Sequence, residues 1–161
     1  MLITLFTISA IADQNCPAMY ASTSTNPSFQ FTISGDEITD KETALIWQRC
    51  SLGKSGSDCS TGTLSRYDWQ GALQVAQEYR DQSGQQWRLP NIKELRSIIE
   101  LNCDNPAVNL AIFQNSGQSL YWSATDYASS TDEAWYVNFN AGESSKQRKS
   151  YNMYVRLVRS K

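Results

Sequence analysis

The segment Trp87–Leu95 constrains the fold of this chain more than any other stretch. Its first three residues are typical of a strand end, and the proline that follows them disfavours helical backbone in the residue before it. Asn91 then stands where a helix N-cap belongs, and Glu94 follows three residues later, as in a capping box. The segment therefore predicts an extended chain that turns into a helix over residues 92–100.

Hydrophobic periodicity predicts two helices and a set of short strands. Asp68 is expected to cap the first helix, which ends near Gly84. Its apolar face would hold Trp69, Ala72, Leu73, Ala76 and Tyr79. Strands are expected at residues 29–33, 45–50, 120–124, 134–140 and 153–159, with a long loop over residues 102–119. Two helices followed by late antiparallel strands make an α+β domain.

Six blocks of sequence make the chain similar to a known family. They are ITD with ALIWQR (residues 38–49), WQGAL (69–73), WRLPNIKEL (87–95), YWSAT (121–125), AWYVNF (134–139) and YVRLVR (154–159). In this order they resemble the bacterial DUF1566 or Lcl C-terminal domain family, which is named after a collagen-like surface adhesin. The resemblance implies a C-type-lectin-like fold whose loops bind ligand. It assigns residues 102–119, 126–133 and 141–152 to the variable surface.

The N-terminus predicts export. Residues 2–12 are apolar and end in Ala10–Ile11–Ala12, the small residues of a cleavage site. No Lys or Arg precedes this run, which suggests a true start codon upstream of Met1. We therefore expect a signal peptide over residues 1–12, an extended leader over 13–34 and the domain over 35–161. The run is too short to span a membrane, which takes about 20 apolar residues.

Four cysteines in an exported chain predict disulfide bonds, and four cysteines allow three pairings. Cys50 and Cys59 flank a loop rich in Gly and Ser, so we expect them to pair and Cys16 to pair with Cys103. A metal site is the alternative. It is disfavoured because no CxxC spacing is present and the chain has no histidine, the commonest zinc partner.

Composition disfavours catalysis. Without histidine, Ser-His and Cys-His nucleophile pairs are absent. Residues 53–56 contain GKS but lack the upstream glycine of a phosphate-binding loop. The formylglycine-generating enzymes share the broader fold and use cysteine chemistry, but disulfide pairing would remove the thiols. We therefore expect no enzyme activity and no cofactor. Calcium is also left out, because residues 104–107 do not supply the six to eight oxygens that it needs.

Several motif residues are expected to be structural. Trp47, Trp87, Trp122 and Trp135 are predicted to lie in the core, because large aromatic side chains dominate core burial, and a role as sugar platforms is the alternative. Arg88 is expected to satisfy backbone carbonyls or to pair with Glu94, because charged groups are seldom buried alone.

Charge is distributed unevenly along the chain. The net charge is −2, from 14 basic and 16 acidic residues. Residues 143–161 hold six basic residues and one acidic residue, a charge of +5, so the remainder carries −7. Lys146, Arg148 and Lys149, with Tyr151, are predicted to form a loop between two strands that binds sulfate or carboxylate groups. A solvated hairpin loop is the alternative.

These patterns favour an exported, non-catalytic binding module that contacts a polyanionic glycan or a protein at the cell surface, as in adhesion. The alternative is a structural or interaction subunit of a periplasmic or surface assembly. A mild net charge is far from the composition of a nucleic-acid-binding protein, so we expect no nucleic acid partner.

Overall fold

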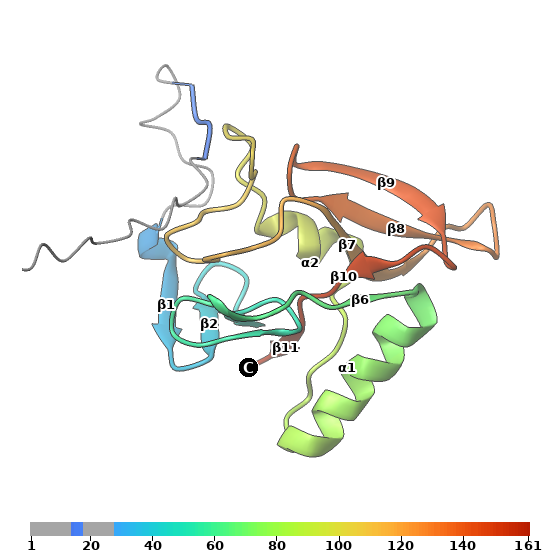
Figure 1. Cartoon of the computed structure of the whole chain (residues 1–161), viewed down its shortest axis with the longest axis horizontal. Coiled ribbons are helices and arrows are strands. Elements are labelled where there is room, and N and C mark those ends of the chain that lie inside the picture. Colours follow the sequence, from blue (N-terminus) through green and yellow to red (C-terminus); the bar gives the residue numbers. More distant parts are fainter. Residues whose placement is uncertain (1–13, 18–27) are drawn as a thin grey trace, which may run out of the picture.

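The computed structural model describes residues 14–17 and 28–161, which form an α+β domain (Figure 1). The expected signal peptide and half of the leader, residues 13 and 18–27, lie outside the described residues. Two helices and three sheets make up the described part of the chain, which confirms the α+β prediction. Neither of these helices is long and apolar enough to cross a membrane.

A four-stranded antiparallel sheet joins the two ends of the domain. Its order is β1 (Phe31–Ser34), β2 (Glu37–Asp40), β3 (Leu45–Gln48) and β11 (Val158–Ser160), and a short 3-10 helix, η2 (Ser28–Gln30), precedes it. Val158 of the last strand lies opposite Trp47. The first three strands are consecutive in the sequence, so the sheet closes only when the C-terminus arrives beside β3.

A five-stranded mixed sheet forms the other half of the domain. Its order is β6 (Arg66–Tyr67), β10 (Met153–Tyr154), β7 (Leu120–Asp126), β8 (Glu133–Asn138) and β9 (Glu143–Arg148). β10 runs parallel to β7, and the other neighbours are antiparallel. A small ribbon of β4 (Lys54–Ser55) and β5 (Thr61–Gly62) lies in the loop that follows β3.

Both helices begin at the predicted caps. The Asp68 carboxylate accepts a bond from the Gly71 N–H at the start of α1 (Trp69–Ser83), and the helix ends at Gly84, whose positive φ of 67° favours glycine. Asn91 and Glu94 form a complete capping box at the start of α2 (Ile92–Ser97).

α2 is shorter than predicted. It stops at Ser97 because the next residues leave the helix to pair with the long loop. Ile99 forms a bridge with Val108, and the Glu100 N–H donates to the Ala107 carbonyl. These long-range bonds replace the hydrogen bonds that a further helical turn would have made.

The helices cover opposite faces of the five-stranded sheet. Neighbouring residues of a strand point to opposite faces. On one face lie Tyr121, Val137 and Phe139 with Leu95 and Ile98 of the α2 region; on the other lie Trp122 and Ala134 with Ala72 and Ala76 of α1. In Figure 1, α2 lies beside β7 and β8, whereas α1 extends below β6. Leu73 is exposed, contrary to prediction, because the small side chains of α1 are the ones that face the sheet.

Residues 102–119 are irregular, as expected, and part of this segment packs into the core through Val108, Ile112 and Phe113. One further prediction is wrong. The predicted strand over residues 153–159 is two strands in different sheets, β10 and β11. The chain crosses between the sheets at residues 155–157, which are fully buried.

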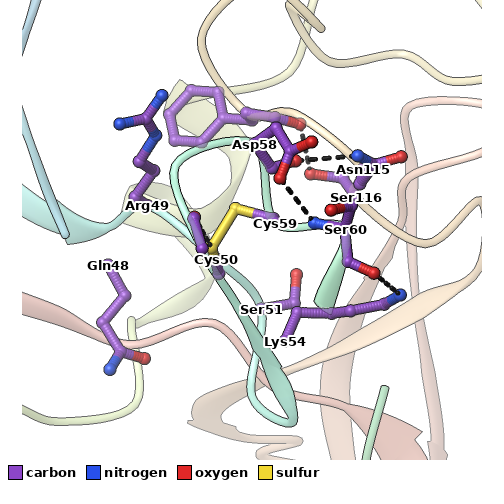
Figure 2. Close-up of a disulfide and its surroundings, with 12 residues drawn as sticks. Gln48, Arg49, Cys50, Ser51, Lys54, Asp58, Cys59, Ser60, Asn115 and Ser116 are labelled. Atoms are coloured by element: carbon purple, nitrogen blue, oxygen red, sulfur yellow. Dashed lines mark hydrogen bonds between the residues drawn. A yellow bond between two sulfur atoms is a disulfide. The ribbon is translucent and has the colours of Figure 1, made fainter. Parts of the chain in front are cut away.

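Two disulfide bonds cross-link the domain, and their pairing is the one that was predicted. Cys50 is joined to Cys59, and Cys16 is joined to Cys103. The second bridge ties the described part of the leader to the long loop, where the Asn15 and Asp104 backbones also exchange hydrogen bonds. The Cys50–Cys59 bridge closes a loop that contains β4, and β5 follows Cys59 in the sequence (Figure 2).

Candidate ligand-binding surface

The four residues predicted to bind an anion do not lie in one loop. Lys146 and Arg148 belong to β9, an edge strand that pairs with β8 along its whole length. Residues two apart on a strand point to the same face, so these two cations lie on one side of the sheet. The sequence of β9 has low strand propensity, and its backbone pairing with β8 overrides that preference.

The Lys146 side chain packs on an aromatic pair. Its ammonium donates a hydrogen bond of 3.0 Å to the Tyr127 hydroxyl and lies 4.1 Å from the centre of that ring. This hydrogen bond lowers the pKa of the Tyr127 hydroxyl and raises the pKa of Lys146. Tyr127 meets Trp135 edge to face, with 5.8 Å between the ring centres. The result is an ordered cation beside two aromatic rings at the surface.

Trp135 is a correction to the prediction that four tryptophans lie in the core. Trp47, Trp87 and Trp122 are buried, as expected, but Trp135 is only partly buried. It stands opposite Lys146 in the β8–β9 register. Trp135 and Val137 are two residues apart on β8, so the alternating pattern of the sequence predicts the same burial for both. The pattern alone therefore could not show that Trp135 lies at the surface.

Lys149 has a different role from Lys146 and Arg148. It follows the end of β9, and its ammonium forms an ion pair of 2.5 Å with Asp126 and lies 4.3 Å from the Trp69 ring centre. Its carbonyl also accepts a bond from the Trp69 N–H at the start of α1. Lys149 therefore holds the first turn of α1 against the sheet.

Tyr151 lies in the turn after Lys149 and is 52% exposed. Its N–H donates to the Arg148 carbonyl, which closes the turn. We define the β9 surface as Tyr127, Trp135, Lys146 and Arg148. Glu133 lies opposite Arg148 in the strand register, so one carboxylate borders this surface.

The remaining cations of the basic C-terminal segment do not extend this surface. Arg156 is fully buried, and Arg159 forms a bidentate ion pair of 2.9 Å with Glu37 across the four-stranded sheet. The charge of +5 in the sequence is therefore spread over the core, two ion pairs and the β9 surface.

Arg88 forms the predicted pair with Glu94. Its two terminal nitrogens lie 2.7 Å from the two carboxylate oxygens. Burial acts to raise the pKa of Glu94, but the bonds from Arg88 and from the Asn91 N–H outweigh it, and the pKa lies below its usual value. The hydrogen bonds to Glu94 also raise the pKa of Arg88. This pair fixes the junction at which the chain enters α2.

The two disulfide bridges use all four cysteines, and among residues 14–17 and 28–161 no group of three or more acidic or cysteine side chains is placed to hold a metal ion. Tyr127, the aromatic residue that the site prediction missed, lies within residues 126–133. Those residues were assigned to the variable surface, so an aromatic residue inside that range was the available signal.

The profile of the Lcl C-terminal domain family matches residues 36–159, a range that runs from the start of β2 into β11 and includes both helices. No curated protein matches the chain.

Proposed function

The chain belongs to the Lcl C-terminal domain family, and on that premise we propose that it is an exported, non-catalytic binding module with a C-type-lectin-like fold. Its ligand in this proposal is an anionic glycan at the cell surface. The meeting of N- and C-terminal strands, with β11 beside β3, supports the lectin-like assignment. So does the long irregular segment between α2 and β7.

The observation that carries the proposal is the ammonium of Lys146 held over Tyr127 beside Trp135. Aromatic rings at a surface present an apolar face with a polar edge, which suits the C–H face of a sugar ring. A fixed ammonium and the nearby Arg148 guanidinium suit a sulfate or carboxylate on the same sugar. An aromatic surface for the sugar ring and cations for its acidic group thus lie side by side.

Export is supported by the disulfide bonds. Bridges between cysteines persist in oxidising compartments and are rare in the reducing cytosol. Two bridges in 161 residues, with an apolar N-terminal run in the sequence, are typical of a domain that works outside the cytosol.

Binding to a panel of sulfated, carboxylated and neutral glycans tests this function. We expect purified domain to bind the anionic members at low salt and to discriminate against neutral ones. Lys146→Met and Arg148→Met should each weaken binding by about tenfold. Lys41→Met, which removes an exposed cation that follows β2 in the other sheet, is the matched control and should bind normally.

One observation favours an interaction subunit as the second candidate. β9 is the last strand of its sheet, so its outer backbone edge pairs with no strand among the described residues. An extended segment of a protein partner can add to such an edge. Failure of every anionic glycan to bind at low salt would favour this candidate over the first.

A further inference from the structure

One cation of α2 reaches the β9 strand. Arg96 lies in the last turn of α2 and is exposed, and its guanidinium donates a hydrogen bond of 2.8 Å to the Ser144 hydroxyl. Ser144 belongs to β9 and lies opposite Val137 of β8, which packs in the core on the α2 side of the sheet. The Arg96 charge is therefore held at β9, on the face that α2 covers.

This cation continues the line that Lys146 and Arg148 begin. Ser144, Lys146 and Arg148 alternate along β9, so their side chains leave the same face of the sheet. Alternate residues of an antiparallel strand are about 7 Å apart. Because Arg96 is bonded to Ser144, three cations follow the strand over roughly 14 Å. We define the cation row as Arg96, Lys146 and Arg148.

Ion pairs do not neutralise the cation row. Among residues 14–17 and 28–161, the ion pairs with carboxylates use four other cations, which are Arg80, Arg88, Lys149 and Arg159. Glu133 lies opposite Arg148 and borders the row, whereas Glu143 is at an odd position of β9 and points to the other face. Three cations beside one carboxylate leave a charge of +2 along the strand.

Neutral hydroxyl groups order two members of the cation row. The Arg96 guanidinium is bonded to Ser144, and the Lys146 ammonium is bonded to Tyr127 at 3.0 Å. A hydroxyl holds such a side chain in place without cancelling its charge. A ligand anion therefore meets cations that have already lost rotamer freedom, which lowers the entropic cost of binding. Charges that only protect an edge strand from aggregation do not need to be held in position.

The positions along the cation row differ in chemistry. The guanidinium groups of Arg96 and Arg148 stand at the two ends, and each can hold a sulfate or carboxylate through two N–H groups. The Lys146 ammonium in the middle is a point charge, and Trp135 lies opposite it in the strand register. A matching ligand has an anionic group at each of three positions and an apolar ring face at the middle one.

We propose that the β9 surface takes a linear chain of repeating anionic units, which lies along β9 and contacts Arg96, Lys146 and Arg148 in turn. This rests on the function proposed above, because Lys146 and Arg148 are shared, and it adds Arg96 as a third contact. A single anionic group cannot reach both ends of a row of roughly 14 Å. Each further unit of a linked chain binds at a high effective concentration, so affinity should rise with chain length until all three cations are engaged.

Titration calorimetry of the full chain with heparin fragments of two, four and six sugar rings tests the cation row. We expect wild-type affinity to rise by about tenfold or more from the shortest to the longest fragment. Arg96→Gln removes the charge and should weaken the six-ring fragment by about tenfold. The same variant should change the two-ring affinity by less than about threefold, because a short fragment can still use Lys146 and Arg148.

Two variants separate the charge of Arg96 from its structural contact. Ser144→Ala removes the hydrogen bond but keeps the charge, and it should bind the six-ring fragment within about threefold of wild type. Arg66→Gln is the matched control. Its guanidinium is also exposed and bonded to a hydroxyl, that of Tyr154 at 3.0 Å, but it lies on β6 at the opposite edge of the same sheet. It should bind all fragments as wild type does.

The cation row is refuted if wild-type affinity does not rise with fragment length, or if Arg96→Gln and Arg66→Gln bind the six-ring fragment equally well. In either case, binding of the two-ring fragment that is lost in Lys146→Met would leave the β9 surface standing as a ligand site. Failure of every fragment to bind at low salt would instead refute the function proposed above, and the cation row with it.

Discussion

The guanidinium of Arg156 donates a 2.8 Å hydrogen bond to the Ser51 hydroxyl, and both side chains are buried. The other bonds of this guanidinium reach the Ser116 hydroxyl and two carbonyls at the end of β3. No carboxylate of the described residues pairs with it; its positive charge lies 5.2 Å from the Phe113 ring centre. Arg156 thus ties the crossing between the two sheets to the disulfide loop.

Replacing Arg156 with Met should strongly destabilise the domain. Two carbonyls and two hydroxyls would lose their charged donor inside the core, and we expect a loss of roughly 3–5 kcal/mol in the free energy of unfolding. Urea denaturation measures it. Arg159→Met is the control, since its partly exposed pair with Glu37 should contribute about 1 kcal/mol or less. Equal losses in the two variants would contradict the central role of Arg156.

The Glu94 carboxylate should make the stability of the domain fall at acidic pH. Its pKa in the folded state is lowered, because the bonds from Arg88 and Asn91 outweigh the effect of burial. The stability that this carboxylate contributes is therefore complete above its unfolded pKa of about 4.3 and is lost as the pH falls through the lower folded value. Urea midpoints measured from neutral to acidic pH should fall more steeply for wild type than for Glu94→Gln. Glu78→Gln, on the exposed face of α1, should follow the wild-type curve; identical slopes for all three proteins would argue against the pairing.

The buried position of Trp87 predicts a large effect of truncation. Trp87→Ala removes a ring that packs against Tyr79 in the α1 core, and we expect a loss of roughly 3–5 kcal/mol. Trp135→Ala should cost clearly less, because Trp135 is partly exposed on β8. Thermal denaturation of the two variants compares them. A melting temperature of Trp87→Ala close to that of wild type would show that the ring is not buried.

The two disulfide bonds should stabilise the domain unequally. In the chain-entropy account, a bridge that closes a longer loop removes more freedom from the unfolded chain. The Cys16–Cys103 bridge spans 87 residues and should contribute about 4–5 kcal/mol, against about 2–3 kcal/mol for Cys50–Cys59, which spans 9. Paired Cys→Ser variants measure each contribution. Peptide mapping without reduction should find no free thiol, and a free Cys50 would disprove the pairing.

The sequence predicted correctly those elements that depend on residues close together in the chain. Asp68, Asn91 and Glu94 placed both helix starts correctly, because a cap is made by residues within one turn of each other. The cysteine pairing also followed from spacing and elimination. In contrast, nothing local marks residues 155–157 as a crossing between sheets, because β10 is defined by its pairing with β6 and β7, and β11 by its pairing with β3, all far earlier in the sequence.

The site was predicted only in part for the same reason. Lys146 and Arg148 lie at the surface as expected, but Lys149 is committed to Asp126 by the fold. Tyr127 reaches Lys146 only because the β7–β8 connection and β9 meet in space.

The salt dependence of binding tests the central claim most directly. Affinity for a sulfated glycan should be measured over a series of salt concentrations for wild type and for a Lys146→Met, Arg148→Met double variant. Because salt screens exposed charges, we predict that wild-type affinity falls steeply with salt, whereas the double variant binds more weakly and depends less on salt at an unchanged melting temperature. Equal affinity of the two proteins across the whole series would contradict a ligand site at the β9 surface.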